Sequence, residues 1–212
     1  QLGGITMHKT FISYHHANEQ DLKDEIIQSG AGDYFIDKSV NDGDIDIHLS
    51  EDTIMRKIRE DYIGDSTVVV VLIGEETSDR PYVNSEIQAA MWGNSTGLIG
   101  IVRDELYDRL YDSGTCNTLG CNCGISLRIR NSEFESKVPY LVKENNTRLE
   151  SGKSTAPHYN DSEAYCGIYK YSLFMKNIET YIDEAFNKRE KDFDVKKSNG
   201  PGVKTITRPN GY

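Results

Sequence analysis

The chain is poor in several features that mark large classes of protein. Basic residues are outnumbered, with 24 Lys and Arg against 34 Asp and Glu and a formal net charge of −10. Because binding to a phosphate backbone needs clustered Lys and Arg, we expect no nucleic-acid partner. Long apolar runs are also missing, since the longest, residues 68–73, has the length of a strand rather than the ~20 residues of a membrane span. We therefore expect no membrane partner.

Two motifs of nucleotide-binding enzymes are absent as well. No G-x-G-x-x-G follows the first expected strand, which argues against a hydride-transferring Rossmann enzyme. No G-x-x-x-x-G-K-[ST] occurs, so the chain is not a P-loop NTPase. Phosphorelay receivers need acidic residues at the end of their first strand, where this chain has Ser13 and Tyr14.

Cysteine is scarce and shows no usual metal-binding pattern. Three of the four cysteines, Cys116, Cys121 and Cys123, lie in one polar stretch with C-x4-C-x-C spacing, and the fourth is Cys166. Zinc sites usually show paired C-x2-C or Cys/His spacing, so we expect loop thiols and no metal. Residues 1–15 lack the apolar segment of a signal peptide, which indicates a cytoplasmic protein with reduced thiols.

Segments typical of strands alternate with amphipathic segments, which predicts an α/β domain with a central, mostly parallel sheet. The run TVVVVLI at 67–73 is β-branched without alternation, as expected for a central strand buried on both faces. Helices are expected after the caps Asn18 and Ser50, and from Pro81 to a stop near Gly93. The other strands are expected at 9–14, 34–37 and 98–102.

The second half of the chain has a weaker pattern. Residues 104–137 are polar and punctuated by Gly, so we interpret them as an insertion with a strand at 125–129. A further strand is expected at 138–142, and one long amphipathic C-terminal helix at 162–188. The predicted organisation is a leader or remnant at 1–7, one domain at 8–190 and a C-terminal tail at 191–212.

Polar side chains collect where the predicted strands end. In open α/β sheets, ligands bind beyond the carboxyl ends of the strands. These ends carry Ser13, Tyr14 and His15 after the first strand, Lys38 after the second, and the loop leading to Glu86 after the third. The sequence predicts one cleft there, with the polar, aromatic and ionisable character of a nucleotide pocket.

Two long stretches resemble TIR-like domains, namely FISYHHANEQDLKD at 11–24 and YFIDKSVNDGDIDIHLSEDTIMRKIREDYIGDSTVVVVLIGEETSDR at 34–80. They are most similar to the ThsB proteins of the Thoeris anti-phage defence system, and the similarity extends over about residues 8–103. The resemblance implies a flavodoxin-like TIR fold. It also implies cleavage of NAD⁺ with release of nicotinamide and formation of a cyclic ADP-ribose isomer. NAD⁺ is then the substrate, and no cofactor is expected.

The resemblance also implies partners. The diffusible product is expected to activate the effector ThsA, a phage structural protein is expected as the trigger, and self-association into a homo-oligomer fits TIR domains in general. The expected location is the bacterial cytoplasm. Two other functions remain open, a non-enzymatic TIR interaction module and a plain NAD⁺ glycohydrolase.

The family's catalytic glutamate lies in a helix stretch that usually reads W-E-I, and the matching residues here are Ser85, Glu86 and Ile87. The resemblance therefore assigns catalysis to Glu86; the alternative is a solvated helix glutamate. Cleavage of the nicotinamide–ribose bond develops positive charge on the ribose, and the neutral leaving group needs no general acid. A carboxylate ~4 Å away is worth roughly 4 kcal/mol at an effective dielectric of ~20, or about three decades in rate.

The remaining site residues each have two interpretations. The 38–48 loop corresponds to the TIR BB loop, for which the resemblance implies a gate over the nucleotide. Within it, Lys38 either pairs with a phosphate or is an ordinary surface lysine, and Asp44 either contacts ribose or caps the next helix. Tyr14 either stacks on a base or packs in the core, and His15 either contacts substrate or is only part of a loop.

Overall fold

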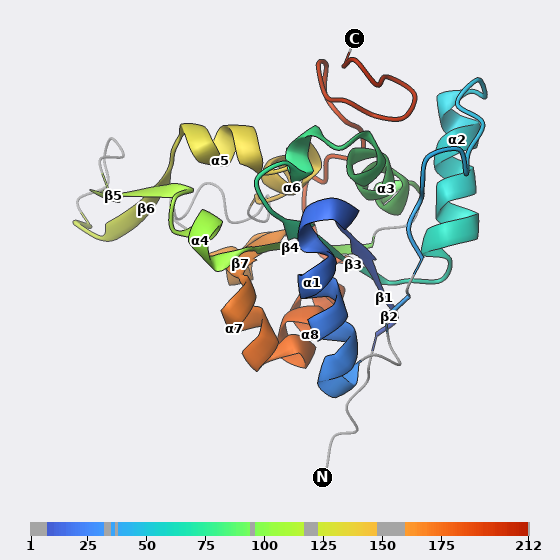
Figure 1. Cartoon of the computed structure of the whole chain (residues 1–212). Coiled ribbons are helices and arrows are strands. Elements are labelled where there is room, and N and C mark those ends of the chain that lie inside the picture. The colour runs from blue at the N-terminus through green and yellow to red at the C-terminus, as the bar shows by residue number, and fades with distance from the viewer. Residues whose placement is uncertain are drawn as a thin grey trace.

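A five-stranded parallel sheet with helices on both faces forms the centre of the molecule (Figure 1). The computed structural model describes residues 8–31, 35–36, 38–93, 96–116, 123–147 and 160–211. The strand order β2-β1-β3-β4-β7 is the 2-1-3-4-5 order of flavodoxin-like folds, so the predicted fold class is confirmed. The strands are β1 (Thr10–Ser13), β2 (Phe35–Ile36), β3 (Val68–Ile73), β4 (Gly97–Val102) and β7 (Gly167–Lys170).

The central strand β3 has the sequence VVVVLI, and all six residues are buried. It pairs with β1 on one side and β4 on the other, in a register that sets Val68 beside Thr10 and Gly97. Glycine at position 97 allows close packing, because a Cβ there would lie 2.5 Å from the backbone oxygen of Ala185. The prediction of a strand buried on both faces is confirmed.

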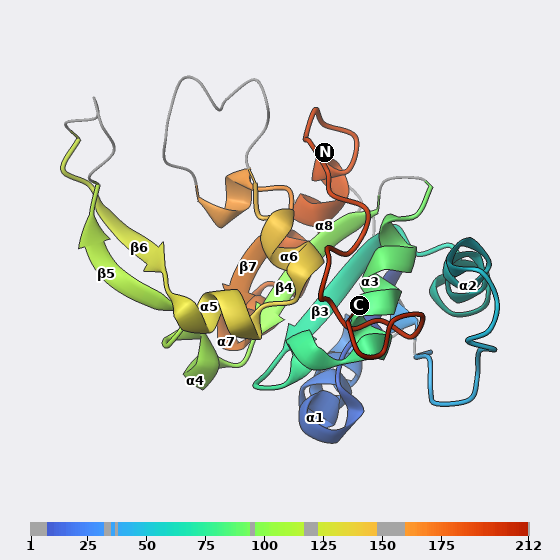
Figure 2. The ribbon, with the colours of Figure 1, turned by 90° about the horizontal axis from the view of Figure 1, so that it is seen from above.

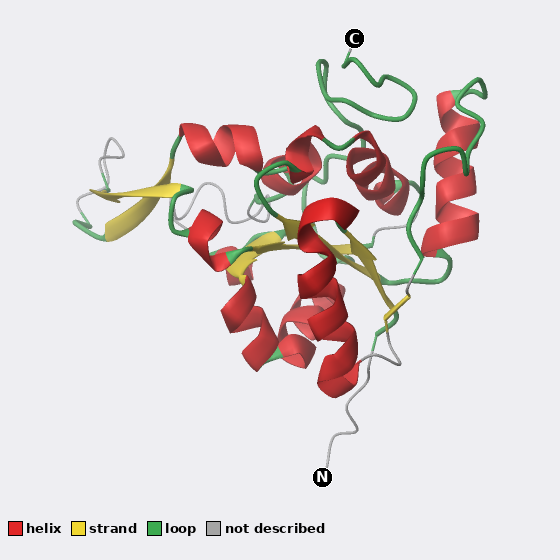
Figure 3. Ribbon diagram, viewed as in Figure 1, coloured by secondary structure: helices red, strands yellow, loops and turns green. Residues whose placement is uncertain are grey.

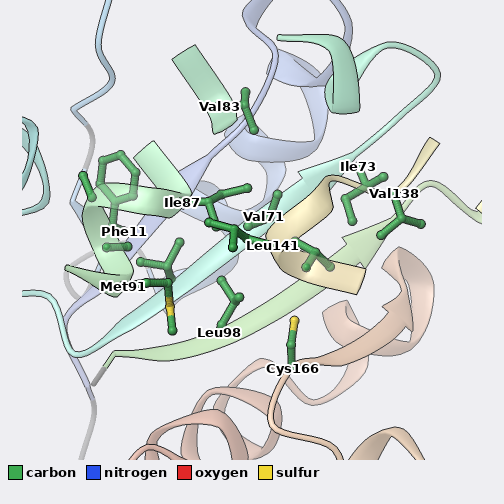
Figure 4. Packing of buried hydrophobic residues seen from close by; sticks show 14 of the residues in the cluster. Phe11, Val71, Ile73, Val83, Ile87, Met91, Leu98, Val138, Leu141 and Cys166 are labelled. Atoms are coloured by element: carbon green, nitrogen blue, oxygen red, sulfur yellow. The ribbon is translucent and has the colours of Figure 1, made fainter. Parts of the chain in front are cut away.

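The two faces of the sheet are covered by different sets of helices, as Figure 3 shows. One face packs against α1 (His16–Ile26), α7 (Tyr171–Lys176) and α8 (Ile178–Lys188). The other packs against α2 (Glu51–Ile58), α3 (Pro81–Met91), α5 (Ser132–Lys137) and α6 (Tyr140–Glu144). In Figure 4, Ile87 and Met91 of α3 lie among Phe11, Val71 and Leu98 of the strands. Shorter helical segments among the described residues are Ile27–Ala31, Arg59–Ile63, Thr77–Asp79, α4 (Asp104–Tyr107) and Asp161–Glu163.

The predicted helix ends are confirmed at α2 and α3 and wrong at α1. The Ser50 hydroxyl accepts a hydrogen bond from the Thr53 backbone, as an N-cap should. Pro81 occupies the first turn of α3, and Gly93 follows the helix with a φ of 75°. Asn18 is not the cap of α1, because the helix already begins at His16. The N-cap is the preceding residue, His15, whose side chain makes no capping hydrogen bond.

The second half of the chain corrects two predictions. Residues 138–142 are not a strand, because Pro139 starts helix α6. The long helix expected at 162–188 is also wrong, since β7, α7 and α8 divide that region. Strand β7 pairs with β4 and shields what would otherwise be an open edge of the sheet. The sequence of this region has the period of a helix, but residues 167–170 pair with β4 and form a strand instead.

The predicted insertion contains a two-stranded hairpin that projects from the body of the molecule (Figure 2). Strand β6 (Ser126–Arg130) confirms the expected strand, while its antiparallel partner β5 (Tyr111–Thr115) was not predicted. Cys121 of the expected loop thiols lies outside the described residues. In the part of the chain that the structure describes, no helix has the length and apolar character needed to cross a membrane.

The C-terminal segment, defined here as residues 195–211, is not an extended tail. It runs across the outer side of α3 (Figure 2). Its residues Asn199, Thr205 and Ile206 are buried, with exposed fractions of 8%, 0% and 4%. The segment is thus part of the packed domain, although it has no helix and no strand.

Candidate functional site

Glu86 lies on α3 with its carboxyl group directed at the carboxyl end of β1. Its side chain is 1% exposed. Oε2 accepts a hydrogen bond of 2.6 Å from the hydroxyl of Ser13, the last residue of β1. Oε1 accepts a hydrogen bond of 2.9 Å from the backbone N–H of Val40 in the 38–48 loop. The structure therefore joins three distant parts of the sequence at this one carboxyl group.

Burial raises the pKa of Glu86 to about 7, against an ordinary value of 4.5. Removing the carboxylate from water disfavours its charged form. The hydrogen bonds from Ser13 and Val40 act in the opposite direction, because each stabilises the anion. Near neutral pH the group therefore exchanges its proton readily, which is typical of residues at functional sites.

The 38–48 loop closes over this carboxyl group. Val40 and Ile45 insert into the core and are 4% and 7% exposed. The hydroxyl of Tyr82, on α3, donates a hydrogen bond of 2.7 Å to the Asp42 carboxylate at the outer side of the loop. Burial and this carboxylate raise the pKa of the Tyr82 phenol to about 12, so it stays a hydrogen-bond donor at neutral pH. Val40 and Ile45 thus hold the loop on its inner side, and the hydrogen bond between Tyr82 and Asp42 holds it on its outer side.

The two loop residues predicted to bind substrate, Lys38 and Asp44, make hydrogen bonds to groups other than Glu86. The Lys38 ammonium donates to the backbone oxygen of Asp61 at 3.4 Å, near the end of the helical turn that follows α2. Asp44 accepts a hydrogen bond of 2.8 Å from the backbone of Asn41, which closes a turn within the loop. Both residues are exposed, so contact with a phosphate or ribose stays a prediction for each.

The two residues after Ser13 differ in their surroundings: the side chain of Tyr14 is packed, whereas His15 belongs to a loop. Tyr14 is 6% exposed, and its hydroxyl donates to Gln20 at 2.8 Å, an arrangement that favours packing. Burial and the nearby Arg80 guanidinium lower the pKa of His15. The Nδ1 atom of His15 is buried and has no hydrogen-bond partner. Arg80, which acts on His15, also forms an ion pair with Glu76.

A second buried carboxyl group, Glu19, was missed by sequence reasoning. It is 0% exposed, and burial raises its pKa. Its Oε2 atom accepts hydrogen bonds from the Thr77 hydroxyl at 3.2 Å and from the His15 backbone at 3.3 Å. Glu19 thereby ties the loop after β1 to the loop after β3. On the sequence it was indistinguishable from an ordinary acidic residue in a first helical turn.

Other contacts of the site were also missed, because they involve backbone groups. Any residue except proline supplies an N–H at position 40, so the sequence gives no signal for this donor.

A cavity of about 820 Å³ lies elsewhere, between the β5–β6 hairpin and residues 160–163. None of the predicted site residues lines it.

Residues 11–108 match the family described as Thoeris protein ThsB, TIR-like domain. The match runs from β1 into the insertion, so it includes Ser13, the 38–48 loop and Glu86. A comparison with curated proteins finds no match. The resemblance noted on the sequence is thus confirmed over these residues, which are similar to the TIR-like domain of the Thoeris anti-phage defence system.

Proposed function

We propose that this TIR-like domain cleaves NAD⁺, releases nicotinamide and converts the remainder into a cyclic ADP-ribose isomer that acts as a second messenger in anti-phage defence. Glu86 is the catalytic residue in this proposal. The observation that carries it is the placement of one buried carboxyl group on α3 between the end of β1 and the 38–48 loop. The family match supports the substrate class.

The chemistry needs one negative charge beside the ribose. As the bond to nicotinamide breaks, the electron pair leaves with the pyridine nitrogen and the ribose carbon becomes cationic. The ionised Glu86 stabilises this cation or accepts a hydrogen bond from a ribose hydroxyl. A site with 1% exposure strengthens this interaction, because little water competes with it.

Substrate access requires movement of the 38–48 loop. Val40 lies directly on Oε1 of Glu86, so the ribose cannot reach that atom while the loop is closed. When the loop opens, a ribose hydroxyl replaces the Val40 N–H as the donor to Oε1, and the Ser13 hydroxyl keeps its place on Oε2. Ser13 then orients the carboxylate throughout the reaction.

Exclusion of water favours cyclisation over hydrolysis. The ribosyl cation is captured either by water or by another group of the same molecule, and a substrate that fills the space uncovered by the opened loop reduces the supply of water at Glu86. The cyclic product would then activate the effector ThsA. His15, which lies in the loop after β1, and the neighbouring Arg80 are the groups that we assign to the phosphates of the substrate, with Lys38 as a further candidate in the open loop.

The test measures NAD⁺ consumption by wild-type protein and by Glu86→Gln, both purified and in bacteria infected with phage. We expect nicotinamide and a product lighter than ADP-ribose by one water in the wild type, and roughly a thousandfold less of both in the variant. The infected cells supply the phage trigger that the family implies.

Three results would contradict the proposal. Equal nicotinamide release by Glu86→Gln would remove the carboxylate from its role. No NAD⁺ consumption by the wild type in either setting would favour a non-enzymatic interaction module, whereas linear ADP-ribose as the main product would identify a glycohydrolase.

A further inference from the structure

Helix α3 is buried on all sides, although its sequence is not apolar on all sides. Every residue from Val83 to Met91 is buried, including the polar Asn84, Ser85 and Gln88. Buried polar side chains need hydrogen-bond partners. The C-terminal segment supplies them from the outer side of the helix.

Asn199 is the centre of this contact. Its backbone N–H and its side-chain amide both donate to Oε1 of Gln88, at 3.0 and 2.9 Å. The same amide donates to the backbone oxygen of Asn84 at 2.9 Å. One side chain of the C-terminal segment thus bridges two positions of α3 that lie four residues apart.

These two positions lie behind the candidate catalytic residue. Residues four apart occupy the same face of a helix, whereas residues two apart are separated by ~200° around the axis. Glu86 is two residues from both Asn84 and Gln88, so its carboxyl group projects from the opposite face. Asn199 therefore contacts the helix directly opposite the carboxyl group and limits rotation of α3 about its axis.

Further hydrogen bonds join Asn84, Ser85 and Gln88 of α3 to the C-terminal segment and to α2. The Asn84 amide donates to the backbone oxygen of Lys204 at 2.9 Å, and the Ile206 backbone donates to the Ser85 hydroxyl at 3.0 Å. The Gln88 amide donates to Glu51 at 2.7 Å. Glu51 begins α2, the helix that follows the 38–48 loop, so the network reaches the element that carries the cover of Glu86.

We propose that Asn199 is a positioning residue for Glu86: through Asn84 and Gln88 it fixes the rotation of α3, and thereby the direction of the carboxyl group towards Ser13 and the ribose. This inference rests on the proposed NAD⁺-cleaving function for its kinetic consequence. Its structural consequence, a fixed environment for the carboxyl group, can be measured without any substrate.

The test compares Asn199→Ala with two control variants. Lys197→Ala changes an exposed residue of the same segment, whose amine contacts Gly93 beyond the helix. Tyr165→Phe removes one buried hydrogen bond, to the backbone oxygen of Thr96, away from the outer face of α3. It therefore controls for a loss of stability without a change at the Asn199 contact.

For each variant we would measure the melting temperature, kcat and KM for NAD⁺, and the titration of the Glu86 carboxyl carbon by NMR with ¹³C-labelled glutamate. The Glu86→Gln spectrum assigns the signal. For Asn199→Ala we expect kcat to fall about tenfold with KM within about twofold. We expect the titration midpoint to move down from about 7, because burial is the main cause of its elevation. Both controls should keep the wild-type kcat per folded molecule and the wild-type midpoint.

Two results would overturn the inference. If Asn199→Ala melts earlier but keeps kcat and the Glu86 midpoint, the segment stabilises the fold and positions nothing. If kcat rises, the segment restrains the enzyme instead of orienting it. Absence of NAD⁺ cleavage in the wild type would contradict the proposed function alone, since the NMR titration still reports whether Asn199 acts on Glu86.

Discussion

Two carboxylic acids lie buried at the same edge of the sheet, and their surroundings differ. Glu86 and Glu19 are 1% and 0% exposed, and burial raises the pKa of both. Each oxygen of Glu86 accepts a hydrogen bond. In Glu19, Oε2 accepts both hydrogen bonds, while Oε1 has no partner and packs against Gly74 so closely that a Cβ there would lie 2.0 Å away.

The difference lies in what covers each group. Glu19 is enclosed by the loops that directly follow β1 and β3, two adjacent strands of the sheet. Glu86 is covered by the 38–48 loop, which carries exposed polar residues and lies at the side of the short strand β2. Burial alone therefore does not distinguish the proposed catalytic acid from a structural one. The proposed function assigns catalysis to the acid that lies under the polar 38–48 loop.

The largest expected effect is a difference in the rate of NAD⁺ cleavage between variants of Glu86 and variants of Glu19. Glu86→Gln should reduce the rate of NAD⁺ cleavage by about three decades, because the charge beside the ribose is lost. Glu19→Gln should stay within about threefold of wild type, since it does not reach the substrate. Nicotinamide release under identical conditions measures both rates, and circular dichroism checks the fold. Similar losses in the two variants would contradict the distinction.

The next prediction concerns stability and pH. Because the pKa of Glu86 is raised from 4.5 to about 7, its contribution to stability is fully present below pH 4.5 and is lost as the pH rises through 7. Glu86→Gln avoids this loss and should be more stable than wild type by up to about 3 kcal/mol well above pH 7. Melting temperatures between pH 4 and 9 measure this. A difference that does not change with pH would contradict the elevated pKa.

A smaller effect is expected for a change at Ser13, whose hydroxyl donates a hydrogen bond to Oε2 of Glu86. Ser13→Ala removes a hydrogen bond that lowers the pKa of Glu86, so the pKa should rise further. At pH 7 the ionised fraction then falls, and we expect about a tenfold loss of activity that partly recovers at higher pH. The pH dependence of kcat/KM measures this shift. Thr77→Ala is the matched control, because it removes a hydroxyl donor to Glu19 and should leave the profile unchanged.

The smallest predicted effect concerns the 38–48 loop, which covers Glu86. Tyr82→Phe removes the hydrogen bond to Asp42 at the outer side of the 38–48 loop. An open loop should become more populated, and we expect kcat/KM for NAD⁺ to rise about two- to fivefold. Tyr171→Phe loses hydrogen bonds to α1 and serves as a control remote from the loop. A lower kcat/KM in Tyr82→Phe would mean that the bond helps to form the productive closed state.

The first four strands of the sheet were predictable because their residues are apolar and their ends carry turn residues. The β3 run is an example, since no other element accommodates six buried β-branched and apolar residues of this length. Strand β7 was missed because its last two residues are only half buried and it continues directly into α7. Its assignment depends on β4, more than 60 residues earlier, and no local pattern encodes that pairing.

The candidate site was only partly predictable for a similar reason. Glu86 and Ser13 were identified by a family motif and by their place at strand ends. The Val40 donor and most contacts of the C-terminal segment involve backbone atoms, which the sequence does not specify. The segment has no periodicity, so it was predicted as a tail, yet Asn199 within it donates hydrogen bonds to Gln88 and Asn84 of α3.

The course of the C-terminal segment has a practical consequence for work with this protein. Arg208 donates hydrogen bonds to Thr205 and Asn199, and Asn199 and Ile206 contact the helix that carries the candidate carboxyl group. We expect an affinity tag or fluorescent protein fused after this segment to crowd that helix and to lower the proposed NAD⁺ cleavage without contacting Glu86. Fusions should therefore be made at the other end of the chain, and inactivity of a C-terminally tagged preparation should be re-examined with the tag removed.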